Sequence, residues 1–262
     1  MSSNYFFDDF KQWLFELDIP FEFKQIATNQ LKILFPQYNQ TIVLIGFYNF
    51  KIPKIDNNEC IFLYEDYWFL KKEIVQNRLK SKWQLSERVF ARKCQIKRIQ
   101  KQECEHFLNQ HHLFGYASAY YKFALIKENV IEAVMCFSKG RKMNDAELPY
   151  FSFELIRFAS KSGTTVIGGF SKLLQHFIKE LKPDHIMTYI DKNWSDANNY
   201  QKFGFKLKSE IYTFRTWINL QNMERLGQKT IEQIEDKKNI IEISPLQNFK
   251  LTLDLRKIGK TL

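Results

Sequence analysis

A glycine pair within residues 165–205 constrains the fold of this chain more than any other feature of its sequence. Gly168 and Gly169 stand between the apolar Val166-Ile167 and an amphipathic run with helical spacing. A second apolar run, 186–190, follows, and the stretch ends in a Gly-Phe turn. This order predicts a strand, a tight turn, a helix, a second strand and a short final helix.

The backbone at such a turn offers a place for a phosphate group. The first N–H groups of a helix have no intrahelical partner, and the helix dipole is positive at that end. An alternative interpretation is that the two glycines only permit a tight strand-to-helix turn. The candidate anion-binding loop comprises Val166, Ile167, Gly168, Gly169, Phe170 and Ser171.

Length and composition indicate a globular protein without a metal site. The 262 residues are enough for one large or two small domains, and the hydrophobic share of 45% supports a core. Lys or Glu interrupts every apolar run, so we expect no membrane partner, and the N-terminus carries no secretory signal pattern. The four cysteines form no Cys-x-x-Cys pair and the five histidines are not spaced like zinc ligands, which favours reduced thiols and a cytoplasmic location.

Positive charge is concentrated in one segment. Between Lys71 and Lys101 there are eleven basic and two acidic residues, so this segment carries +9 of the net charge of +10. Such a block favours DNA or another polyanion as a partner, and the alternative is a solvated basic helix without one. The candidate nucleic-acid-binding residues are Lys80, Lys82, Arg88, Arg92, Lys93, Lys97 and Arg98.

The first 80 residues predict a small α/β domain. Aromatic and aliphatic side chains form one helical stripe over residues 4–17, and short strand-like runs follow at 21–26, 31–35, 41–47 and 60–64. A further helix is predicted from residue 65 to residue 78. We therefore expect a domain at 1–80 and a basic linker at 81–100.

The remaining pattern predicts a second α/β domain at 101–226 and a C-terminal extension at 227–262. Two late strand-like runs, 240–243 and 249–255, lie in that extension. The elements expected in the domain are a helix at 103–112, a hairpin at 117–126 and 130–137, a strand at 151–159, a helix at 171–181, a strand at 185–191, a short helix at 196–203 and a closing strand at 209–220.

The second domain resembles the GNAT N-acyltransferases. The glycine turn, the following strand and the Tyr200-Gln-Lys-Phe-Gly-Phe ending resemble the acyl-CoA-binding half of that fold. The His112-x-x-Gly and Glu154-Leu-Ile-Arg-Phe elements resemble GNAT-like domains of phage and mobile-element proteins. The resemblance implies a mixed, mostly antiparallel sheet, a strand bulge that receives the acyl carbonyl, and acetyl-CoA or another acyl-CoA as cofactor.

The resemblance also implies catalytic candidates, each with a structural alternative. Tyr200 matches the position of the acid that protonates the leaving thiolate, or it packs on the last helix. Asp191 ends a strand, where it could act as a base or cap the next turn. His112 is a candidate base or a buried ring.

Two further residues of this domain bear on the proposed site. Glu154 and Arg157 are three residues apart on a predicted strand, so we expect them on opposite faces, with one pointing into the site. Glu154 is the catalytic candidate of the two. Phe170 and Thr165 depart from the usual acyl-CoA loop, and Phe170 is expected to crowd the pyrophosphate if its ring points inward.

The first domain is similar to very-short-patch-repair and restriction-endonuclease-like proteins over residues 31–38, 42–48 and 62–68. That chemistry needs an Asp and a Glu on adjacent strands to hold Mg²⁺. This chain has Lys32 and Val43 at those positions, although Glu65 and Asp66 remain. We therefore predict a nuclease-like domain without catalysis, which docks DNA or stabilises its neighbour.

Together these patterns predict a DNA-associated, GNAT-like acyltransferase of phage or mobile-element type. A non-catalytic nucleic-acid-binding protein with both domains degenerate is the first alternative. A relative of homing or restriction endonucleases is the second. The sequence leaves the oligomeric state open.

Overall fold

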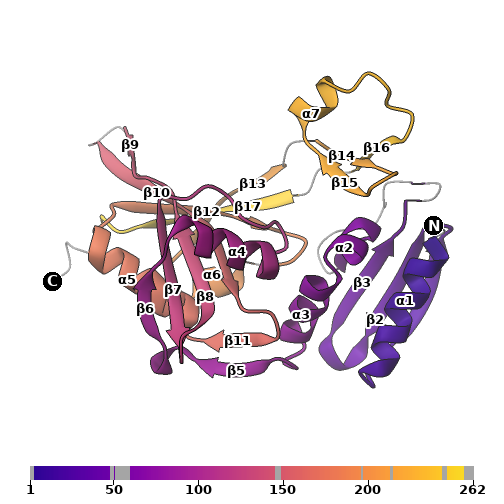
Figure 1. The fold of residues 1–262 in the computed structure, drawn as a ribbon, viewed down its shortest axis with the longest axis horizontal. Helices are drawn as coiled ribbons and strands as arrows, with labels where there is room; N and C mark the ends of the chain where they lie inside the picture. The colour runs from indigo at the N-terminus through magenta and orange to yellow at the C-terminus, as the bar shows by residue number, and fades with distance from the viewer. Residues whose placement is uncertain are drawn as a thin grey trace. The chain divides into compact units, whose positions relative to one another are not determined.

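The computed structural model describes residues 3–47, 50, 60–144, 149–195, 197–212, 215–243 and 247–256, and it divides into two compact units. The first unit combines Met1–Lys72 with Asp191–Trp194 and Tyr212–Gln247. The second combines Glu73–Ile190 with Ser195–Ile211 and Asn248–Leu262. Each unit is therefore built from segments that are far apart in the sequence. The colours of Figure 1, which run by residue number, identify these segments.

The first unit contains the helix, the four strands and the second helix that the sequence predicts in that order. Its four-stranded sheet has the order β1-β2-β3-β4, with antiparallel β1–β2 and β2–β3 pairs and a parallel β3–β4 pair. Aromatic residues of the first helix pack on Trp68, whose ring centroid lies 4.8 Å from that of Phe10. The elements are α1 (Ser3–Glu16), β1 (Glu22–Ala27), β2 (Gln30–Phe35), η1 (Pro36–Tyr38), β3 (Gln40–Ile45), β4 (Cys60–Tyr64) and α2 (Glu65–Leu70).

A late segment completes the first unit. The three-stranded sheet β15-β14-β16 comes from β14 (Thr216–Asn219), β15 (Glu224–Leu226) and β16 (Ile240–Ile243), with α7 (Gln228–Glu232) between the last two. Buried Ile218 and Ile243 share a hydrophobic cluster with Val43, Ile45 and Phe62 of the early sheet. This division differs from the predicted boundaries, because the apolar face of the late segment is buried against β3 and β4.

The second unit is built on a mixed, mostly antiparallel sheet, as the sequence predicts. Its strand order is β13-β17-β12-β10-β8-β7-β6. An eighth strand, β9, pairs with β10 and is not part of this linear order. The β10–β12 pair is parallel, whereas the β8–β10, β7–β8 and β6–β7 pairs are antiparallel. The strands are β6 (Gln95–Arg98), β7 (Tyr121–Lys127), β8 (Val130–Phe137), β9 (Arg141–Met143), β10 (Tyr150–Ser160), β12 (His185–Asp191), β13 (Lys206–Tyr212) and β17 (Gln247–Asp254).

Two helices cover the two faces of this sheet. On one face, which we call face A, α5 (Gly169–Leu181) places Phe177 on Phe137 with their ring centroids 3.6 Å apart. On the other face, face B, α4 (Lys101–His111) buries Cys104, Phe107 and Leu108 against β7 and β8. A short helix, α6 (Asn198–Gln201), lies between β12 and β13 in the sequence.

The basic segment is folded and does not form a linker. It continues from α3 (Lys72–Lys82) through β5 (Glu87–Phe90) and η2 (Ala91–Lys93) into β6. β5 pairs in parallel with β11 (Thr164–Ile167), the strand that leads into the glycine turn. The pairing between 87–90 and 164–167 therefore connects most of this segment to the second unit.

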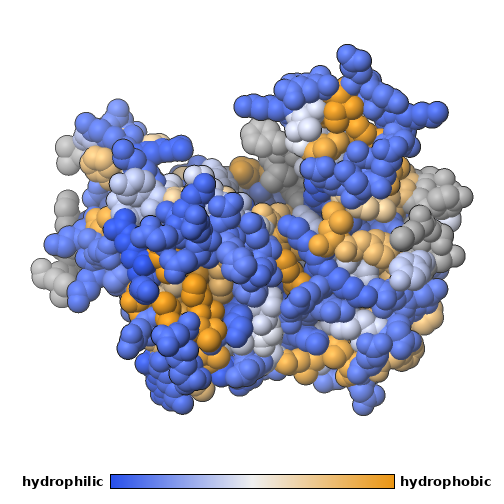
Figure 2. Space-filling model, viewed as in Figure 1, coloured by the Kyte–Doolittle hydropathy of each residue, from blue (hydrophilic) through white to orange (hydrophobic). Residues whose placement is uncertain are grey.

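Hydrophilic residues cover most of the face shown in Figure 2, and hydrophobic residues interrupt them in small areas. Within the described residues, no helix has the length and hydropathy needed to cross a membrane.

Candidate active site

The glycine turn opens α5 as predicted, and both glycines have a conformational or packing reason to be there. Gly168 is the N-cap residue in the left-handed region with φ +75°, where a side chain would be strained. A Cβ on Gly169 would lie 2.9 Å from Cγ1 of Val166, so only glycine allows this close packing. The first intrahelical bond runs from the Lys172 N–H to the Gly168 carbonyl oxygen at 3.0 Å. The N–H groups of residues 169–171 precede that bond, so the turn can hold an anion.

Phe170, the second residue of α5, packs into an aromatic cluster. Its ring centroid lies 5.2 Å from that of Phe158, 4.9 Å from that of Tyr200 and 5.0 Å from that of Phe203. The ring therefore contributes to the hydrophobic core beside the turn, where it fixes Tyr200 relative to the start of α5. From the sequence, the Phe170 ring was expected to crowd a bound pyrophosphate if it pointed inward. In the structure the ring packs on Phe158, Tyr200 and Phe203.

Tyr200 belongs to the same cluster and stays protonated at neutral pH. Burial raises the pKa of its phenol to about 12, with Arg78 acting in the opposite direction. The contacts of Tyr200 match the packing alternative for this residue. Its phenol also carries a proton that it could donate, as a general acid must.

A β-bulge brings Glu154 and Arg157 to the same face of the sheet. In the β10–β8 ladder Leu155 lies opposite Phe137, whereas Arg157 lies opposite Cys136, so one extra residue is inserted between them. Leu155 packs on face A, and Cys136 belongs to the cluster on face B. Strand alternation then places both Glu154 and Arg157 on face B. The expectation that they face opposite sides is wrong, because it assumes a regular strand.

Arg157 connects the bulge to the loop that follows α4. Its Nε donates to the Gly115 carbonyl oxygen at 3.3 Å, and its Nη1 donates to the Ile156 carbonyl oxygen at 2.9 Å. Burial lowers the pKa of the guanidinium, while Cys136 and Glu154 favour its charged form. Half-buried Glu154 accordingly has a cation and a fixed loop on its own face of the sheet.

His112 lies half-buried in that loop, at the C-cap position of α4. Its Nδ1 accepts a hydrogen bond from the Phe114 N–H at 3.1 Å, so the imidazole stabilises the turn that ends at Gly115. Because Arg157 binds the Gly115 carbonyl, the structure links the His112 loop to the Glu154 strand. It supports neither a fully buried ring nor an isolated surface base.

Asp191 ends β12 and is assigned, with residues 192–194, to the first unit. Its Oδ1 accepts a hydrogen bond from the Asn193 N–H at 2.9 Å, and its carbonyl oxygen accepts one from the Trp194 N–H at 3.1 Å. These contacts match the turn-capping alternative for this residue.

The parallel strands β10 and β12 stop pairing before either strand ends. Their ladder runs from Ser152–His185 to Leu155–Thr188, and Thr188 Oγ1 donates to the Leu155 carbonyl oxygen at 2.9 Å. Both strands are described in full, and β10 continues to Ser160. The β10–β12 ladder therefore ends next to the bulge, while β10 continues in its pair with β8 to Ser160.

Cations flank the glycine turn. In the β5–β11 pair, Arg88 lies opposite Thr165, and exposed Arg92 follows in η2. A Cβ on Gly168 would lie 3.8 Å from the Cβ of Ala91, which shows how close η2 comes to the turn. Part of the basic segment predicted to bind nucleic acid thus lies beside the candidate anion-binding loop.

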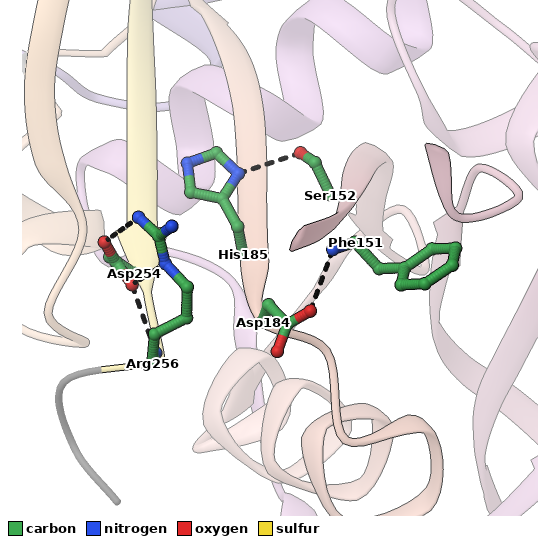
Figure 3. Close-up of polar contacts among 6 residues, drawn as sticks. All are labelled: Phe151, Ser152, Asp184, His185, Asp254 and Arg256. Carbon is green, nitrogen blue, oxygen red and sulfur yellow. Dashed lines mark hydrogen bonds and ion pairs between the residues drawn. The ribbon is translucent and has the colours of Figure 1, made fainter. Parts of the chain in front are cut away.

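A polar cluster on face B has no counterpart in the sequence prediction (Figure 3). Ser152 Oγ and His185 Nδ1 are 2.8 Å apart, and Asp254 and Arg256 lie beside the imidazole. Burial lowers the pKa of His185, while Asp254 raises it and Arg256 lowers it. Three strands supply these residues, so only their pairing could have revealed the cluster.

The first unit lacks the metal ligands of a nuclease at the expected positions. Lys32 and Val43 lie directly opposite each other in the β2–β3 pair. Asp66 is bound to Arg225 at 2.6 and 3.1 Å, and Glu65 accepts a hydrogen bond from the Phe47 N–H at 2.8 Å. Burial raises the pKa of Glu65. Tyr48 of that pattern lies outside the described residues.

In the described part of the chain, no group of three or more His, Cys, Asp or Glu side chains could hold a metal ion.

Comparisons with known proteins give structural likenesses only. No family model and no curated protein matches the chain. The ribosomal-protein-S18-alanine N-acetyltransferase from Escherichia coli has 14% identity and a TM-score of 0.40, with 64% of this chain and 98% of that chain covered. An acetyltransferase from Bacillus subtilis in complex with CoA has 18% identity and a TM-score of 0.39, with 62% and 99% covered.

A GNAT family acetyltransferase from Elizabethkingia anophelis with acetyl-CoA bound has 13% identity and a TM-score of 0.37. The match covers 62% of the present chain and 99% of the Elizabethkingia protein. Since these TM-scores are below 0.5, the strand order and the site geometry, and not these likenesses, support the function proposed next.

Proposed function

We propose that the second unit is a GNAT-like acyltransferase that uses acetyl-CoA or another acyl-CoA and acts in association with DNA. The observation that carries this proposal is the bulge in β10 next to the end of the β10–β12 ladder. The resemblance found in the sequence implies such a bulge for the acyl carbonyl. The glycine turn that opens α5 lies at the end of the same β10–β11–α5 run.

The residues at the turn fit the phosphates of an acyl-CoA. Three N–H groups precede the first intrahelical bond of α5, and the helix dipole adds positive potential there. Phe170 packs into the aromatic cluster, and Arg88 and Arg92 contribute positive charge on the neighbouring β5 and η2. When bound, the cofactor supplies an acyl group as a thioester.

The chain's own side chains supply the proton transfers of an amine acylation. Glu154 is a half-buried carboxylate beside the bulge and accepts the proton that the amine loses. Arg157 positions the His112 loop on the same face through the Gly115 carbonyl. Tyr200 keeps its proton at neutral pH, and its ring packs on Phe170 at the start of α5, so it is the candidate donor to the leaving thiolate.

Calorimetric titration of the full chain with acetyl-CoA tests this proposal. Ser171→Asp is the informative variant, because Ser171 is the third residue of α5, where a carboxylate favours the helix but repels a phosphate. We expect saturable binding by the unaltered protein and a loss of at least about tenfold in the variant. Ser171→Asn, which adds no charge, is the matched control. Absence of binding at high ligand concentration would contradict the proposal.

A second candidate is a nucleic-acid-binding protein without catalysis. It is favoured by exposed cations on β5, η2 and β6 that form no ion pair within the described residues. This alternative predicts salt-sensitive binding of nucleic acid and no acetyl-CoA binding, so the same titration separates the two.

The first unit is proposed to be a nuclease-like scaffold of phage or mobile-element type that has lost catalysis. The direct pairing of Lys32 with Val43 supports this proposal, since a lysine repels Mg²⁺ and a valine offers it no ligand. Plasmid DNA should remain intact with the protein and Mg²⁺. Cleavage that Glu65→Ala abolishes would instead favour the endonuclease alternative.

A further inference from the structure

Five exposed cations of the second unit lie within a short run of chain, residues 88–98. Arg88, Arg92, Lys93, Lys97 and Arg98 are all exposed, and within the part of the chain that the structure describes none of them forms an ion pair. Arg88 donates a hydrogen bond to the Gln84 side chain at 3.2 Å, which leaves its charge uncompensated. Exposed cations that are close together in the chain and have no ion pair create a positive potential, which favours a polyanion.

Aromatic rings lie beside these cations. The Arg92 guanidinium carbon is 5.1 Å from the centroid of Phe90, and that of Arg98 is 5.3 Å from the centroid of Tyr121. Phe90 is 41% exposed, and Tyr120, whose ring centroid is 4.8 Å from that of Tyr121, is 54% exposed. Large exposed rings next to cations provide stacking surfaces together with phosphate ligands. We call Arg88, Phe90, Arg92, Lys93, Lys97, Arg98 and Tyr120 the basic edge.

We propose that the basic edge binds single-stranded nucleic acid, with phosphates on its cations and bases stacked on Phe90 and Tyr120. A duplex hides the faces of its bases in the helical stack, so it would use the cations but not the rings. A single strand exposes both its phosphates and its base faces. The inference rests on the proposed association with DNA but not on acyl transfer.

Fluorescence anisotropy with a labelled oligothymidylate and a duplex of equal length tests the proposal on the full chain. We expect tighter binding of the single strand, with an affinity that falls steeply as salt rises. Arg92→Glu with Lys97→Glu should weaken binding at least about tenfold and flatten the salt dependence. Lys206→Glu with Lys208→Glu changes the net charge equally on exposed positions of β13 and is the control.

Substitution of the rings distinguishes stacking from charge alone. Phe90→Leu keeps an apolar side chain but removes the aromatic face, and we expect about a tenfold loss of single-strand affinity. Leu207→Ala removes a similarly exposed apolar side chain on β13, away from the basic edge, and should leave the affinity unchanged. An unchanged affinity in Phe90→Leu would overturn the stacking assignment.

Three other outcomes would overturn the proposal. One is tighter binding of the duplex than of the single strand. Another is an equal loss of affinity in the Lys206 and Lys208 control, which would mean that net charge alone attracts the oligonucleotide. The third is complete displacement of the oligonucleotide by acetyl-CoA, which would assign these cations to the cofactor phosphates. Acetyl-CoA binding itself is measured separately, so failure here does not decide the acyltransferase proposal.

Discussion

The two units use charged side chains in opposite ways. In the first unit Asp66 is only 2% exposed, and Arg225, which it binds at 2.6 and 3.1 Å, lies 3.8 Å from the ring centroid of Tyr67. In the second unit Glu154 is half-buried beside a bulge, and the cations of β5 and β6 are exposed. The same residue types therefore stabilise packing in one unit and remain available to a ligand in the other.

This contrast shows why residue type alone is a weak guide to a catalytic carboxylate. Glu65 and Asp66 are the acidic residues that the proposed nuclease-like pattern retains, yet Glu65 accepts a backbone hydrogen bond and Asp66 binds an arginine. Glu154 shares face B with a cation because of an irregularity of the backbone, since the bulge after Leu155 brings Arg157 to the same face.

The largest effect that sharpens the contrast is expected for Glu154→Gln. Removing a general base lowers a reaction rate by about 10²–10⁴-fold, because the amine must then lose its proton to water. Acetyl-CoA affinity should stay unchanged, as the glycine turn is untouched. Steady-state acetylation of an amine panel measures the first quantity and calorimetry the second. A parallel loss of cofactor binding would point to a structural role for Glu154.

Asp66→Ala should lower the free energy of unfolding of the first unit and leave the acetylation rate unchanged. Breaking a buried ion pair by removing one partner costs about 3–5 kcal/mol, because Arg225 is left without its carboxylate. Asp254→Ala, which breaks the more exposed Asp254–Arg256 pair of the second unit, should cost about 1 kcal/mol or less. Urea unfolding followed by hydrogen exchange in each unit gives both values. Equal costs would remove the contrast between the units.

Gly169→Ala should destabilise the second unit by about 1–3 kcal/mol, since the new Cβ overpacks a core contact. Its Cβ would lie 2.9 Å from Cγ1 of Val166 and 3.1 Å from the Cβ of the same residue. Gly227→Ala in the first unit meets nothing within 4 Å and should cost about 1 kcal/mol or less, through the weaker N-cap. Thermal unfolding compares the two variants, and Val166→Ala should rescue the first of them.

The smallest expected effect is on alkaline stability. Burial raises the pKa of Tyr64 in the first unit and of Tyr200 in the second from 10.0 to about 12. The folded state thus favours the neutral phenol, and the resulting stability is complete below pH 10 and is lost as the pH rises through 12. Tyr64→Phe and Tyr200→Phe should each flatten this decline, as followed by tyrosinate absorbance and circular dichroism. An identical decline in both variants and the unaltered protein would contradict the assignment.

Much of the local structure was predictable from the sequence. The run 60–64 is β4, the run 31–35 lies within β2, and the helix expected at 171–181 is α5 with two further residues at its start. These segments combine a clear apolar period with turn residues on both sides, so local preference and burial agree. The mixed, mostly antiparallel sheet of the second unit also follows the predicted order of elements.

The assembly of the units was not predictable from local patterns. Residues 209–220 have the alternation of a single strand, yet the structure divides them between β13 and β14, which belong to different units. Likewise the strand-like run 249–255, whose sheet the sequence left open, corresponds to β17 (247–254), which lies between β12 and β13 in the large sheet. Periodicity identifies a strand, but it carries no information about which sheet the strand joins.

Some features of the candidate site were also predictable from the sequence, and others needed the tertiary structure. The glycine turn was predictable, because glycine adopts the left-handed conformation of Gly168 without strain and leaves room for the close contact of Gly169 with Val166. The pairing of Glu154 with Arg157 on face B was not, since the bulge that shifts the register is a property of two paired strands. The Ser152–His185 contact likewise needs the β10–β12 register.

The sequence by itself determined which segments are helices or strands, where the chain turns tightly and where positive charge accumulates. These properties depend on residues that are near one another along the chain, and a local pattern is sufficient to express them. Only the tertiary structure decided that the late segment 212–247 completes the first unit and that the basic segment lies beside the glycine turn. Those outcomes arise from burying apolar faces contributed by distant segments, and the free energy of burial depends on which faces meet.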